Sequence, residues 1–128
     1  MTGVPDRPGP PEGAMKIEIL RQDGVATVVV QGELDAAQKS EVGKTVQGLL
    51  ASGESRLVFD VAGVTYMGSS GVGCLVQARK DAMAKSGAVA MVNPPPMIRK
   101  VFKTLGLEKD FPVYPSRDAA VKALAKPL

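Results

Sequence analysis

The feature that most constrains the fold is an alternation of two kinds of segment along most of the 128-residue chain. Short runs rich in β-branched residues indicate strands, and between them longer segments carry apolar residues at helical spacing. The first two runs, Met15–Leu20 and Val25–Gln31, are joined only by Gln22-Asp23-Gly24, which predicts an antiparallel hairpin. The sequence therefore predicts one α/β domain with a mixed sheet of about five strands, the later ones parallel, and about four helices.

The other elements are placed by turn and cap residues. Asp35, followed three residues later by Gln38, resembles a capping box, which predicts that the first helix begins near Ala36. Pro96 suits the first turn of a helix, Ser116 is expected to cap the last helix, and Pro112 favours an edge strand. The expected strands are 56–61, 88–92 and 111–114, and the expected helices are 36–51, 70–85, one from 96 and one after 116.

The core is expected to consist of aliphatic side chains, because 45% of the residues are hydrophobic and only 4% are aromatic. Cys74 is expected to be a small core residue, and Gly87 and Gly106 are expected to end helices. The apolar face of the helix after position 70 is predicted to hold Val72, Leu75, Val76, Ala82 and Met83. That of the helix from 96 is predicted to hold Met97, Ile98, Val101, Phe102 and Leu105.

Composition excludes several classes of function. The chain has no histidine, which removes Ser-His-Asp and Cys-His arrangements and most metal sites. Its single cysteine cannot form an internal disulfide, which fits a reducing cytoplasm. The net charge of +3 is modest, and no stacking aromatics accompany the basic residues, so direct nucleic-acid binding is not favoured. We expect a cytoplasmic protein with no cofactor and no metal.

The first residues differ in composition from the rest. Residues 1–13 hold four prolines and three glycines, which predicts a flexible tail over 1–14 and a domain over 15–128. This stretch lacks the apolar core of a signal peptide, and no run in the chain approaches the length that spans a membrane.

The stretch from Val64 to Val76 is expected to run from a loop into a helix that starts near Ser70. Two serines at this junction suggest either an ordinary helix cap or a place where a phosphate or carboxylate meets the helix start. A P-loop is excluded because no lysine lies between Asp60 and Arg79. A nucleophile elbow is excluded because Val72 stands where its last glycine belongs. The segments 32–35 and 68–71 both follow strands and are expected to meet at one end of the sheet.

These segments carry a resemblance to a known family. The chain resembles a STAS domain, and within that family the stand-alone bacterial anti-sigma factor antagonists, over roughly Met15 to Leu124. The resemblance rests on Gly32-Glu33-Leu34-Asp35, Leu57-Val58-Phe59-Asp60, Tyr66-Met67-Gly68-Ser69-Ser70-Gly71-Val72-Gly73 and Phe102-x-x-Leu105-Gly106-Leu107.

The resemblance implies a partner switch. Family members bind an anti-sigma factor that is also a serine kinase, which frees a sigma factor, and phosphorylation of the antagonist ends the interaction. The phosphorylated serine corresponds to Ser69, and Ser70 would be a cap and helper. Asp35 would lie on the same contact surface. The partner-binding residues implied in this way are Asp35, Gly68, Ser69, Ser70, Gly71 and Val72.

Position 68 departs from the pattern, because phosphorylated members usually carry aspartate where this chain has Gly68. Two alternatives therefore stand beside the switch: an antagonist that binds constitutively, and a non-phosphorylated STAS scaffold subunit of a stress-signalling or lipid-transport complex. An enzyme or phosphate-ligand protein is disfavoured, because no base, metal site or nucleotide motif accompanies the glycines. A monomer or weak dimer is expected, with any association at the sheet edge around Tyr114.

Overall fold

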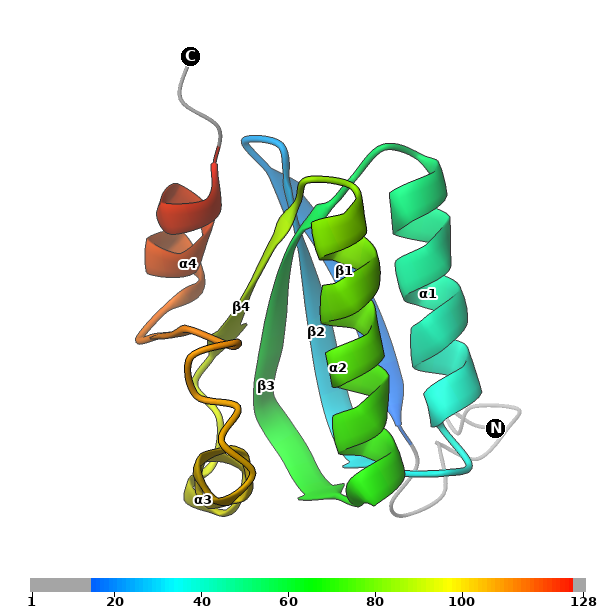
Figure 1. The fold of residues 1–128 in the computed structure, drawn as a ribbon, viewed down its shortest axis with the longest axis vertical. Helices are drawn as coiled ribbons and strands as arrows, with labels where there is room; N and C mark the ends of the chain where they lie inside the picture. The colour runs from blue at the N-terminus through cyan, green and yellow to red at the C-terminus, as the bar shows by residue number, and fades with distance from the viewer. Residues whose placement is uncertain (1–14, 126–128) are drawn as a thin grey trace, which may run out of the picture.

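The computed structural model describes residues 15–125 of the chain. The tail expected over 1–14 lies outside the described residues. Within the described part, a five-stranded sheet carries helices on both faces (Figure 1). The strands are β1 (Lys16–Gln22), β2 (Val25–Leu34), β3 (Arg56–Met67), β4 (Ala88–Val92) and β5 (Val113–Tyr114). The helices are α1 (Lys39–Ala51), α2 (Ser69–Ala84), α3 (Pro96–Thr104) and α4 (Arg117–Leu124).

The sheet has the predicted topology. Its strands follow chain order, β1-β2-β3-β4-β5, with β1 antiparallel to β2 and every later pair parallel. The β1–β2 turn is formed by Asp23 and Gly24, both at positive φ (54° and 78°), which suits a tight hairpin. β5 lies at the edge of the sheet, as Pro112 indicated. The mixed α/β fold expected from the sequence is thus confirmed.

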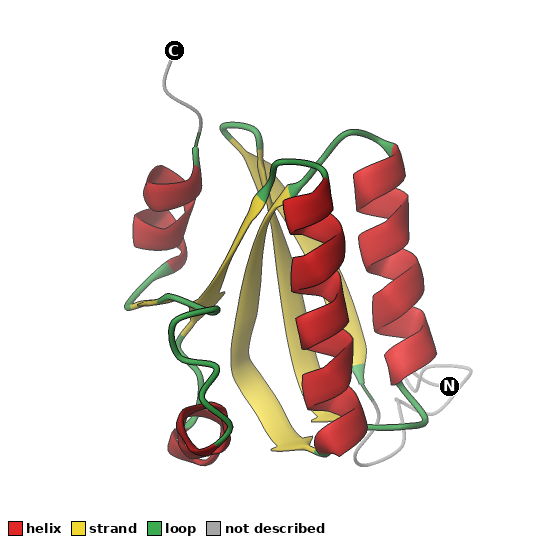
Figure 2. Ribbon diagram, in the orientation of Figure 1, coloured by secondary structure: helices red, strands yellow, loops and turns green. Residues whose placement is uncertain are grey.

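The core has two layers, one on each face of the sheet. Alternate residues of β2 and β3, such as Val28 and Phe59, contribute to the layer that includes α1, α2 and α3. The intervening residues face α4, where Val58 packs with Val121 and Leu124. Figure 2 shows α1 and α2 side by side in front of the strands and α4 apart from them. Since these two layers bury the central strands on both faces, β2, β3 and β4 carry nearly continuous apolar runs, whereas the edge strand β1 alternates and has no fully buried residue.

Several predicted boundaries are wrong. β2 continues to Leu34 and β3 to Met67, because their parallel pairing persists through two register shifts, so 64–67 is strand and not loop. Gly32 is at φ 92°, a left-handed conformation that glycine adopts without strain beside the second shift. α1 begins at Lys39, not near Ala36, since residues 36–38 form turns.

Three residues expected in the core are on the surface. Met83 and Met97 are 48% and 44% exposed, because they lie at the edges of the buried faces of α2 and α3. Leu105 is 57% exposed and follows the last residue of α3 as its C-cap. Gly87 does not take the left-handed position after α2, which Ser86 occupies at φ 59°. A side chain on Gly87 would instead collide with the carbonyl oxygen of Ser55. Gly106 does end α3, at φ 72°.

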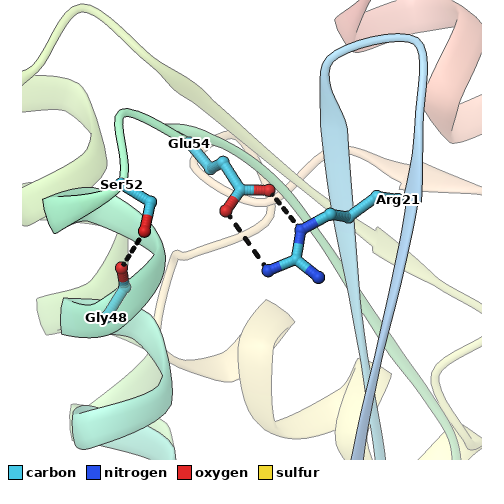
Figure 3. Close-up of polar contacts among 4 residues, drawn as sticks. All are labelled: Arg21, Gly48, Ser52 and Glu54. Carbon is cyan, nitrogen blue, oxygen red and sulfur yellow. Dashed lines mark hydrogen bonds and ion pairs between the residues drawn. The ribbon is translucent and has the colours of Figure 1, made fainter.

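Near the hairpin turn, a side-chain ion pair joins β1 to the segment that precedes β3 (Figure 3). Arg21 Nε and Nη2 donate to the two oxygens of Glu54 over 2.6 and 3.3 Å. The hydrogen bond and the charge of Glu54 raise the pKa of the Arg21 guanidinium. Nearby, the Ser52 hydroxyl donates to the Gly48 carbonyl over 3.1 Å, so it satisfies a carbonyl of the last turn of α1.

Candidate functional site at the carboxyl end of the parallel strands

The segments after β2 and β3 meet, as the sequence predicted. Leu34 pairs with Met67, the last residue of each strand, and the Gly68 amide then donates to the Leu34 carbonyl over 3.1 Å. This brings Asp35 against the start of α2. Figure 1 shows the start of α2 and the segment leading into α1 at the same end of the sheet. The site is therefore built by two parallel strands that end at the same level.

Gly71 allows this close approach. A side chain at position 71 would collide with the carbonyl oxygen of Leu34, and its β-carbon would also lie 3.0 Å from Leu34 Cγ. Gly73, two residues on, has nothing within 4 Å of such an atom. One glycine of the Gly-Val-Gly sequence is thus required by packing, whereas the other is open to solvent.

Neither serine caps α2. The helix begins at Ser69, and its N-cap residue is Gly68, with φ −85°, ψ 178° and no side-chain cap. Ser69 is exposed and Ser70 is half-buried, and neither hydroxyl hydrogen-bonds another described residue. The expectation that Ser70 is a cap is therefore wrong. Because glycine has no side-chain oxygen to cap the helix, the N–H groups of the first turn can still donate hydrogen bonds to another group.

Asp35 does not cap α1 either. Its amide donates to Gln38 Oε1 over 3.0 Å, which is half of a capping box, but the N-cap of α1 is Gln38. The half-buried Asp35 side chain turns instead toward α2, where a β-carbon on Gly68 would collide with its carboxylate. The positive end of the α2 dipole favours a negative charge in this place.

Burial divides the predicted partner-binding residues into two groups. Ser69, Ser70 and Asp35 reach the surface, whereas Gly68, Gly71 and Val72 are buried at the first turn of α2. The three buried residues can affect binding only through the shape that they give to this turn. One exposed residue was missed: Tyr66, 47% exposed, pairs with Glu33 in the ladder just before the site. A surface aromatic beside these segments suits an interface, and a longer β3 in the prediction would have placed it there.

A groove of about 570 Å³ between α1 and α2 begins at Ser70. Cys74, half-buried and packed against the core, forms part of it. Glycines on both helices open the groove, and Gln47 and Gln77 donate to the two carboxylate oxygens of Asp81 at its other end. Its lining comprises Ser40, Gly43, Lys44, Val46, Gln47, Ser70, Gly73, Cys74, Gln77, Ala78 and Asp81.

The site combines a serine hydroxyl, a carboxylate and the start of a helix. Over residues 15–125 the structure shows no group of three metal-ligating side chains. In the same part of the chain, no helix combines the length and the apolar character needed to cross a bilayer. What the site offers is an exposed hydroxyl at the positive end of a 16-residue helix, with a carboxylate beside it. The start of the helix favours an anion, whereas the neighbouring carboxylate opposes a second one.

Comparison with known proteins agrees with this geometry. The chain is 31% identical over 84 residues to an anti-sigma F factor antagonist of Lysinibacillus sphaericus, covering 63% of this chain and 72% of that protein. It is 28% identical over 109 residues to BtrV of Bordetella bronchiseptica, covering 85% and 94% of the two chains. The crystal structure of an anti-sigma factor antagonist from Mycobacterium paratuberculosis superposes with a TM-score of 0.79 at 27% identity, covering 91% and 98%.

The family model for the STAS domain matches residues 16–120, which include all five strands and the site at their carboxyl ends. The resemblance seen in the sequence is therefore confirmed over nearly the whole described part of the chain. This protein belongs to the STAS domain family.

Proposed function

We propose that this protein is a cytoplasmic anti-sigma factor antagonist. In this proposal it binds an anti-sigma factor with serine kinase activity, which releases a sigma factor, and phosphorylation of Ser69 ends the interaction. The relatives named as antagonists support the role, and the observation that carries the switch is Ser69 itself. It is the first residue of α2, it is exposed, and its hydroxyl forms no hydrogen bond with another described residue.

The physical basis of the switch is the charge of the phosphate. An unmodified Ser69 adds a small polar group to a contact, whereas a phosphoserine adds nearly two negative charges that a partner surface must desolvate. The start of α2 lowers the cost of that charge in the free protein, so the modified chain stays folded. No catalytic group is needed on this chain, because ATP, magnesium and the base belong to the kinase.

The test is binding to each candidate serine-kinase anti-sigma factor of the same organism, measured by titration calorimetry. We expect Ser69→Ala to bind like the unmodified chain and Ser69→Asp to bind more weakly by about 3 kcal/mol, because it introduces an uncompensated charge into the contact. Ser52→Asp, at the opposite end of the sheet, is the matched control and should bind normally. Equal binding by Ser69→Ala and Ser69→Asp would contradict the switch and favour a scaffold that binds regardless of this residue.

A further inference from the structure

Asp35 and Gly68 fit each other as a pair. A β-carbon at position 68 would collide with the Asp35 carboxylate, so the absence of a side chain on Gly68 makes room for it. Gly68 directly precedes Ser69, the first residue of α2. The carboxylate of one segment therefore lies over the residue next to the hydroxyl of the other.

The backbone around this pair is fixed, whereas the Asp35 side chain is not. Leu34 is held by its ladder pairing with Met67 and by the hydrogen bond from the Gly68 amide. None of the side chains that the structure describes donates a hydrogen bond to the Asp35 carboxylate. Its place at the positive end of α2 is favoured by the helix dipole, which contributes only modestly for a partly exposed group.

A phosphate on Ser69 would compete with this carboxylate. It carries nearly two negative charges and three acceptor oxygens. It would lie one residue from Gly68, so close to the carboxylate that salt screens their repulsion only weakly. Both groups would be attracted to the same helix start, and the phosphate has the larger charge. Since no described side chain holds the carboxylate by a hydrogen bond, it is the group that moves.

We propose that Asp35 is the residue through which phosphorylation of Ser69 acts on the segment between β2 and α1. The phosphate expels the Asp35 carboxylate from its place over Gly68, while the backbone pairing of Leu34 with Met67 stays in place. The idea rests on the proposed function, because it assigns a consequence to the phosphate on Ser69. One modification thereby alters both segments of the candidate partner surface.

The test uses the full chain with phosphoserine inserted at position 69 during translation, so that no kinase or partner is needed. The readout is the nuclear Overhauser effect between the Asp35 β-protons and the Gly68 α-protons. It should be present in the unmodified protein and fall at least fivefold in the phosphorylated one. In Asp35→Asn, a neutral side chain of the same shape, phosphorylation should leave the corresponding signal within about twofold of its unmodified intensity.

Persistence of the signal in phosphorylated protein with Asp35 would overturn the proposal, as would an equal loss in Asp35→Asn. Phosphoserine at position 52, at the far end of the sheet, should leave the signal intact, and its loss there would also count against a local effect. These results do not depend on a kinase. If no kinase modifies Ser69 but the signal responds as expected, the proposed function fails and the coupling stands.

Discussion

The first turns of α2 and α4 are held in place by different kinds of contact. At α4, side chains do the fixing: the Ser116 hydroxyl accepts from the Ala119 amide over 3.1 Å, and Arg117 pairs with the buried Asp60 at 2.5 Å. At α2, the N-cap is a glycine without a side-chain cap, and the first turn is held by backbone fit against Leu34.

The difference separates hydroxyls that support the fold from hydroxyls that do not. Ser116 satisfies a helix amide that would otherwise lack an intrahelical partner. Ser69 and Ser70 satisfy no such amide, although they stand at the start of a longer helix. A serine with no structural role at a helix start is free to be modified without loss of the fold.

The largest effect on stability is expected where the backbone fit of α2 is broken. Gly71→Ala should lower the free energy of unfolding by about 3 kcal/mol, because the added carbon meets the rigid carbonyl of Leu34. Gly73→Ala is the control in the same helix and should raise that free energy by up to about 1 kcal/mol, since the site is open and alanine favours helix. Urea denaturation measures both, and equal effects at the two positions would refute the packing argument.

A smaller effect is expected at the ion pair that holds α4. Asp60→Asn should lower the free energy of unfolding by about 2 kcal/mol, because it removes a charged acceptor for Arg117 from a position whose side chain is only 8% exposed. The oxygen that accepts from the Ala62 amide can be retained by asparagine. Asp118→Asn, also in the first turn of α4, is the control and should cost a few tenths of a kcal/mol. A loss at Asp118 as large as that at Asp60 would contradict this account of the α4 start.

The smallest changes in stability are expected when the serines at the two helix starts, Ser116 and Ser69, are replaced by alanine. Ser116→Ala should lower the free energy of unfolding by about 1 kcal/mol, the usual cost of losing a side-chain cap. Ser69→Ala should change it by less than about 0.5 kcal/mol, as expected for a surface side chain without a partner in the described structure. Thermal unfolding of the two variants gives the comparison, and a larger loss for Ser69→Ala would show that this hydroxyl supports the fold after all.

Local patterns predicted most of the architecture. The hairpin at Asp23-Gly24, the start of α3 at Pro96, the Ser116 cap and the edge position of β5 follow from turn and cap chemistry, and all are confirmed. The meeting of Asp35 with the start of α2 was expected because strands that end together bring their following segments together.

The predictions that are wrong concern features that are determined by residues distant in the sequence. The extension of β3 to Met67 depends on its pairing with β2, which leaves no signal within β3 itself. The turn of the Asp35 carboxylate toward Gly68, away from α1, depends on a missing side chain about thirty residues later in a different element. The exposure of Met97 depends on how far α3 is rotated against the core, and that of Leu105 on the end of α3 at Thr104; helical spacing alone determines neither.

The most direct test of the central claim is the intact mass of the protein after incubation with ATP, magnesium and each serine-kinase anti-sigma factor of its own organism, followed by mapping of the modified residue. We expect one added phosphate, located on Ser69, and none in the Ser69→Ala variant, which keeps Ser70 and Ser116 available as alternative acceptors. A tight complex without any added phosphate, or a phosphate located on Ser70 or Ser116, would contradict the claim that Ser69 is the switch.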